Sequence, residues 1–173
     1  MKKNKNGFTL VELLVVIVVL ALIMIITIPA VLDIMEDARK NAFVLYCQKV
    51  VKDTQTQYVY DSNIGNAGGA GLYVYDITSD LGYSSTGNYR GYVVVDATSS
   101  SGTKYILNLY DNNYAIANWN VNDKGDPTTS NLQNYSASLY SQYFKSPVTA
   151  CRNATTNSSS YQCQNRNGYI ISN

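Results

Sequence analysis

The hydrophobic and polar positions divide the N-terminal part of the chain sharply. Residues 1–7 are short, basic and polar, whereas the twenty positions from Leu13 to Leu32 carry no charge, and only Thr27 and Pro29 interrupt their apolar character. A helix of twenty residues spans about 30 Å, the thickness of the hydrocarbon core of a bilayer. The lysines before this run predict that the N-terminus stays in the cytoplasm and that the rest of the chain lies outside.

After this run the pattern becomes amphipathic. Apolar residues recur at three- and four-residue steps with charged residues between them, as at Val31, Met35, Ala38, Ala42 and Leu45. This spacing predicts a helix with one apolar stripe. We expect one helix from about Phe8 to about Tyr60, roughly 80 Å long. Its membrane-spanning part covers residues 8–32 and its amphipathic part covers residues 33–60.

The remainder of the chain predicts a small sheet. Residues 61–91 read as a loop that includes the flexible stretch GNAGGAG. Strand-forming residues then occupy 92–121, in three runs at Tyr92–Val95, Tyr105–Tyr110 and Tyr114–Val121, with a hairpin turn at Asp111–Asn113. Residues 122–173 are again rich in turn residues. The predicted fold class is α+β, with the long N-terminal helix packed against a small antiparallel β-sheet.

Composition and charge exclude one class of partner. Of the residues, 46% are hydrophobic and only 14% are charged, and sixteen tyrosines stand against three phenylalanines. Tyrosine suits half-buried positions, because its ring packs while its hydroxyl stays hydrated. Lys2, Lys3 and Lys5 account for the net charge of +1, since the other 10 basic and 12 acidic side chains leave a formal charge of −2. With no long basic run, the chain is not predicted to bind nucleic acid directly.

The polar residues form no recognisable catalytic or metal-binding set. The chain has no histidine and no CxxC pair, and its acidic residues are scattered among turns rather than paired on one element. Asp76, Asp80, Asp123 and Asp126 are potential calcium ligands, but their spacing matches no calcium loop and favours ordinary turn residues. We therefore predict no catalytic residue, no metal and no cofactor, and a protein that is not an enzyme.

The segment GFTLVELL, which begins at Gly7 and leads into the apolar run, resembles the N-terminus of the type IV pilin family. The resemblance covers about the first 35 residues and is closest to the type IVa branch with its class III signal peptide. It implies that residues 1–7 are a leader and that a prepilin peptidase cuts between Gly7 and Phe8. It also implies that the new Phe8 amine is methylated, that Glu12 is the carboxylate used in assembly, and that Pro29 kinks the helix.

The physical chemistry of Glu12 agrees with such a role. A lone carboxylate at the edge of a membrane-spanning run costs several kcal/mol unless it is neutralised or paired. Cleavage creates a cationic amine on Phe8, only four residues earlier in the chain. In a filament, the Phe8 amine of an incoming subunit could pair with Glu12 of a neighbour and set the register. Cohesion would come from packing of the apolar helices.

The resemblance further implies the partners and location of the protein. It predicts a single-pass precursor in the bacterial cell membrane, which an inner-membrane platform and an assembly ATPase lift into an extracellular pilus. The pilus would be a helical homopolymer whose core is formed by residues 8–32. Such filaments serve adhesion, twitching motility, biofilm formation or DNA uptake. Alternatives are a pseudopilin of a type II secretion or competence system, a secretory signal peptide or plain anchor, and a membrane-anchored enzyme.

The three cysteines allow more than one pairing. Cys151 and Cys163 resemble the pair that closes the C-terminal disulfide-bounded region of the family, while Cys47 falls within the helical pattern. A disulfide over this spacing would add about 3 kcal/mol and fits an extracellular setting. The alternatives are two reduced thiols, or a bond from Cys47 to either of the other two. Cys47 is otherwise expected as a buried helix residue facing the sheet.

Overall fold

A computed structural model describes residues 7–84, 87–154 and 162–171. The chain divides into two compact units, residues 1–39 and residues 40–173, and each is considered by itself. Residues 1–6 of the predicted leader lie outside the described part. Helix α1, Leu10–Asn63, contributes to both units, since its residues up to Arg39 belong to the first and those from Lys40 to the second.

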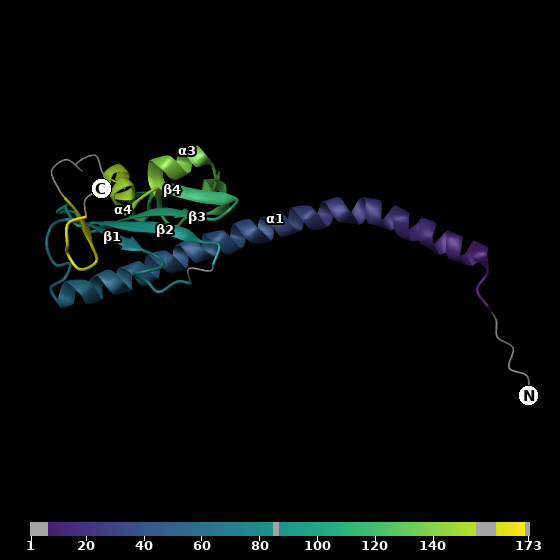
Figure 1. Ribbon diagram of the computed structural model, residues 1–173, viewed down its shortest axis with the longest axis horizontal. Helices are drawn as coiled ribbons and strands as arrows, with labels where there is room; N and C mark the ends of the chain where they lie inside the picture. The colour runs from purple at the N-terminus through teal and green to yellow at the C-terminus, as the bar shows by residue number, and fades with distance from the viewer. Residues whose placement is uncertain (1–6, 85–86, 155–161, 172–173) are drawn as a thin grey trace, which may run out of the picture. The chain divides into compact units, whose positions relative to one another are not determined.

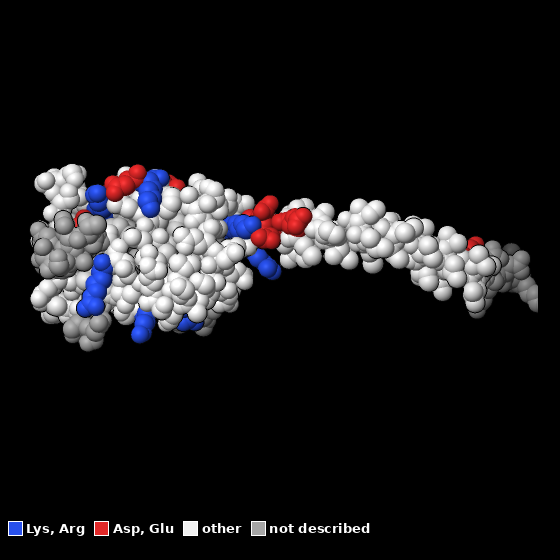
Figure 2. All heavy atoms as spheres, turned by 90° about the horizontal axis from the view of Figure 1, so that it is seen from above, with Lys and Arg blue, Asp and Glu red and all other residues white. Residues whose placement is uncertain are grey.

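The first unit is the N-terminal part of α1. The helix is assigned through Pro29 without interruption, and its large apolar side chains are exposed, from 80% for Leu10 to 46% for Met35. In Figure 2 this part of the helix is white over most of its length, which marks uncharged side chains. Among the described residues, α1 is the one helix long and apolar enough to cross a membrane.

The second unit is built on a sheet of six strands within the described residues, in the order β5-β4-β3-β2-β1-β6. All neighbouring strands are antiparallel except β1 and β6, which are parallel. The strands are β1 (Leu72–Asp76), β2 (Arg90–Asp96), β3 (Lys104–Tyr110), β4 (Tyr114–Asn120), β5 (Gln133–Asn134) and β6 (Cys163–Asn165). The short helical segments are α2 (Val121–Lys124), η1 (Thr129–Asn131), α3 (Ala137–Leu139), the π-helix η2 (Tyr140–Phe144) and α4 (Pro147–Ala154).

The sheet is packed on both faces. The part of α1 in this unit covers one face and α4 covers the other (Figure 1). Successive strand residues point to opposite faces, so Val93 packs against α1 while its neighbour Val94 packs in the cluster that contains α4. The helix supplies Phe43, Cys47, Val50 and Val51 to the first cluster. The predicted α+β class, with a long helix on a mainly antiparallel sheet, is confirmed.

Three of the strands differ from expectation. The predicted loop over residues 61–91 contains β1, and the turn-rich region 122–173 contributes β5, β6 and the helices from α3 to α4. The expectation of only three strands was therefore wrong. The physical reason is that β1 is held by partners distant in sequence, since Leu72 pairs with Asp96 on β2 and with Cys163 on β6. The hairpin between β3 and β4, expected from local sequence, is present at residues 111–113.

Candidate processing and assembly site

The start of α1 is closed by reciprocal hydrogen bonds between Thr9 and Glu12. The backbone N–H and the hydroxyl of Thr9 both donate to Oε2 of Glu12, at 2.8 Å each. In return, the backbone N–H of Glu12 donates to Oγ1 of Thr9 at 3.3 Å. This is a capping box, in which a hydroxyl residue before the helix and an acid three residues later satisfy each other's backbone donors. Glu12 is therefore held at the N-terminal end of the helix.

The bond between Gly7 and Phe8 lies just before this cap and is open to approach. Phe8 is 83% exposed, and Gly7 is exposed as well. A Cβ added to Gly7 would meet nothing within 4 Å. The fold of the described residues therefore gives no steric reason for glycine at this position, so any requirement for it must come from whatever recognises this segment.

The residues singled out from the sequence fall into three separate places. Gly7, Phe8 and Glu12 lie together around the start of α1. Pro29 lies within the helix in the same unit, well away from this end, and the cysteines lie in the second unit. The cleavage, methylation and assembly roles assigned to the first group, and the kink assigned to Pro29, stay predictions.

The capping role of Thr9 was not anticipated from the sequence. The signal for it was present, because Thr9 and Glu12 have the three-residue spacing of a capping box immediately before an apolar run. Glu12 thus has a local structural role within its own chain. Its carboxylate also contributes favourable negative charge to the positive end of the helix dipole.

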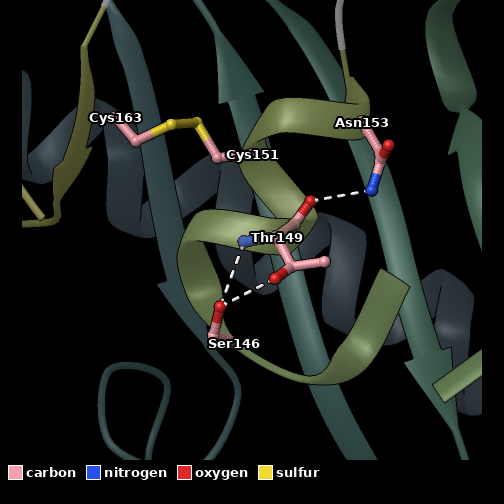
Figure 3. The surroundings of a disulfide bond; sticks show 5 residues. All are labelled: Ser146, Thr149, Cys151, Asn153 and Cys163. Atoms are coloured by element: carbon pink, nitrogen blue, oxygen red, sulfur yellow. Dashed lines mark hydrogen bonds between the residues drawn. A yellow bond between two sulfur atoms is a disulfide. The ribbon is translucent and has the colours of Figure 1, made fainter. Parts of the chain in front are cut away.

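The disulfide of the second unit joins α4 to β6. Cys151 and Cys163 are bonded, with their Cα atoms 6.2 Å apart, while Cys47 is free and buried (Figure 3). The start of α4 is fixed by Ser146, whose Oγ accepts the backbone N–H of Thr149 at 3.2 Å. Farther along, the side chain of Asn153 donates to the carbonyl of Thr149 at 3.0 Å. The pairing suggested by the resemblance is therefore present, and Cys47 takes the buried helix position.

Comparison with known proteins adds one match. Residues 2–28 match the family described as the prokaryotic N-terminal methylation motif, which is the class III signal peptide of type IV pilins. Neither the curated proteins nor the solved structures give a significant match to the chain. The matched segment contains Gly7, Phe8, Thr9 and Glu12, together with most of the apolar run. The matched class III signal peptide thus supports a precursor of the type IV pilin-like or pseudopilin kind.

Proposed function

We propose that this chain is a structural subunit of a type IV pilus. A prepilin peptidase cuts it between Gly7 and Phe8, and the new Phe8 amine is methylated. The apolar part of α1 holds the subunit in the membrane as a single-pass precursor, with its N-terminus in the cytoplasm. An inner-membrane platform and an assembly ATPase then move it into an extracellular helical homopolymer.

One observation carries this proposal. Over the most apolar window of α1, none of the side chains is buried in the described structure, although the mean hydropathy there is 3.2. Such a surface is stable only in contact with lipid or with other apolar surfaces. Lipid covers this apolar surface before assembly, and the same segments of neighbouring subunits cover it in a filament. The methylation motif over residues 2–28 supports the same reading.

The capping box explains how Glu12 could serve two purposes at once. Both donors of Thr9 use the same oxygen of Glu12, namely Oε2. A carboxylate offers about four lone-pair sites, so it can hold the cap and also accept a charged amine from a neighbouring subunit. Removal of residues 1–7 leaves both Thr9 donors in place. We infer that the cap orients the carboxylate toward an incoming Phe8 amine.

The proposal is tested on surface material sheared from cells that express the chain. Electron microscopy of this material should show long thin fibres. Mass spectrometry of the same fibres should identify a peptide that begins at methylated Phe8. Fibres with an intact leader, or a processed protein found only in short assemblies retained within the envelope, would contradict the proposal. The second of these results would assign the chain to the pseudopilins instead.

A further inference from the structure

The sheet carries a small hollow on the face opposite α1. Its volume is about 180 Å³, and its walls include Asp76, Thr78, Arg90, Tyr92, Tyr110 and Phe144. This volume corresponds to about six water molecules at about 30 Å³ each, well below the roughly 300 Å³ at which drug-sized pockets begin. The hollow is therefore suited to one small ring.

Strand register brings the walls together. Asp76 on β1 is paired with Tyr92 on β2, and Arg90 on β2 is paired with Tyr110 on β3. Arg90 and Tyr92 are two residues apart on one strand, so all four side chains share a face of the sheet. Between them, Gly91 has a φ of +136°, and a Cβ there would lie 2.0 Å from the carbonyl oxygen of Asn108. Glycine at this position therefore permits the close approach of β2 and β3 beneath the hollow.

Two of the walls are held rigidly. The Tyr110 ring lies 4.8 Å from the ring of Phe144 and stacks on Tyr135 at 5.2 Å with an interplanar angle of 13°. The carboxylate of Asp76 accepts the backbone N–H groups of Thr78 at 2.7 Å and Ser79 at 3.1 Å through Oδ1. A site whose polar and aromatic groups are already fixed loses little conformational entropy when a ligand binds.

The chemistry of the walls selects the class of ligand. One carboxylate and one guanidinium give the hollow no net formal charge, so the attraction of an ion to one of them is offset by repulsion from the other. The carboxylate accepts hydrogen bonds, the guanidinium donates them, and tyrosine and threonine hydroxyls do both. Burial, with a smaller contribution from Asp76, raises the pKa of Tyr92 to about 12, so its phenol keeps its proton at neutral pH.

We propose that this hollow binds a single neutral pyranose unit of a glycan. A pyranose has a ring of hydroxyl groups around its edge, which match the mixed donors and acceptors of Asp76, Arg90 and Tyr92. It also has an apolar C–H face, which suits an aromatic wall such as Tyr110. This binding function is independent of the polymerisation proposed above, since every wall lies within the second unit.

The test uses the full chain in a polyoxyethylene detergent, because detergents with sugar headgroups would compete for the site. Saturation-transfer NMR is recorded with the methyl glycosides of glucose, galactose, mannose and N-acetylglucosamine. Acetate and methylammonium serve as anionic and cationic probes. At least one glycoside should receive saturation, and neither ionic probe should.

The variants Asp76→Asn and Arg90→Gln should each weaken glycoside binding about tenfold, as expected for the loss of a hydrogen bond to a charged group. Asp126→Asn and Arg152→Gln change exposed residues outside the hollow and should bind as the parent does. Thermal unfolding of each variant checks the fold. Because Arg90 is exposed, Arg90→Gln should stay folded and can test the site even if Asp76→Asn unfolds. The proposal would be overturned if no glycoside received saturation, or if only an ionic probe did. It would also be overturned if Asp76→Asn and Arg90→Gln were folded and bound glycosides as the parent does.

Discussion

Arg166, just beyond β6, forms an ion pair with Asp61 near the C-terminal end of α1, with Nη2 and Oδ1 3.2 Å apart. The Asp61 side chain is fully buried, and it also accepts hydrogen bonds from the side chain of Gln57 at 2.9 Å and the hydroxyl of Tyr75 at 3.1 Å. Arg166 in turn donates to the carbonyl of Asp80 at 2.9 Å. This pair ties the C-terminal segment to α1, whereas the disulfide ties β6 to α4.

Replacing Arg166 with Met should lower the free energy of unfolding of the second unit by about 3 kcal/mol, because a buried carboxylate loses its cation. Chemical denaturation of the full chain in detergent, followed by circular dichroism, measures the change. The matched control is Lys104→Met, which breaks the more exposed ion pair with Asp123. That variant should cost about 0.5 kcal/mol. Equal effects in the two variants would show that burial does not strengthen the Asp61 pair.

Replacing Cys151 and Cys163 together with Ser should cost about 3 kcal/mol, since the bond restricts the unfolded chain. Protection of backbone amides from hydrogen exchange should fall more in β6 than in β2, because β6 is a three-residue edge strand. Hydrogen exchange of the full chain would resolve the two strands. The control Cys47→Ala changes a buried cysteine without removing a bond. A uniform loss of protection across the sheet would argue against a local role for the disulfide.

Replacing Glu12 with Val should permit leader removal but impair entry into filaments. The physical reason is that the carboxylate proposed to pair with the neighbouring Phe8 amine is gone. The Glu12→Gln variant removes the charge but keeps the cap, since the amide oxygen can still accept hydrogen bonds from Thr9. This variant should also assemble poorly. Quantitative blotting of membrane and sheared fractions, normalised to processed protein, measures both effects.

Thr9→Val is the matched control for the cap. It removes the hydroxyl contacts of the capping box and should destabilise the start of the helix by about 1 kcal/mol, while the charge of Glu12 remains. Processing should stay near the parental level, and assembly should fall less than in Glu12→Gln, because the backbone N–H of Thr9 still donates to the charged carboxylate. Normal assembly of Glu12→Gln combined with failure of Thr9→Val would assign Glu12 to capping alone, against the proposed pairing.

Replacing Gly7 with Leu should leave an unprocessed precursor in the membrane. A Cβ at this exposed position meets nothing within 4 Å, so the change should not disturb the folded chain. Mass spectrometry of the membrane fraction would detect the retained leader, and formation of the Cys151–Cys163 disulfide would report correct folding of the second unit. Efficient cutting of this variant after residue 7 would remove the case for glycine recognition there.

Alkaline pH should destabilise the second unit. Tyrosines in the unfolded chain lose their protons at about pH 10. Burial raises the pKa of Tyr46 to about 12 and that of Tyr92 to about 12. Between about pH 10 and about pH 12 the unfolded state binds fewer protons than the folded state, so the free energy of unfolding falls as pH rises. Denaturation across this range should show the decline.

The Tyr46→Phe variant should flatten that decline because one of the shifted hydroxyls is absent. Tyr169→Phe, at an exposed position, should follow the parental curve. A pH dependence unchanged in Tyr46→Phe would show that this hydroxyl does not contribute.

Local sequence was sufficient for the elements whose stabilising contacts are local. The twenty uncharged positions and the stripe after them predict α1, and the turn at residues 111–113 predicts the hairpin of β3 and β4. Strand β1 was not predictable in this way. It is flanked by a glycine-rich stretch and lies between β2 and β6, whose residues come from distant parts of the chain.

The same distinction holds for the functional residues. The Thr9–Glu12 cap was readable from a three-residue spacing, although it was not anticipated. The hollow beside Asp76 could not be read from sequence, because its walls come from strands β1, β2 and β3, from the turn after β1 and from η2. Only pairing of Asp76 with Tyr92 and of Arg90 with Tyr110 places these side chains together. The sequence showed only that the chain is unusually rich in tyrosine.

The order of the strands has a consequence for the proposed polymer. The outermost strands of the described sheet are β5, with two residues, and β6, with three, while the longer strands β1 to β4 lie between them. A short edge offers few backbone groups to another sheet, which guards against strand-to-strand aggregation. In the proposed fibre, crowded subunits would therefore lie close together without their sheets fusing, and contact between copies would be left to helices and side chains.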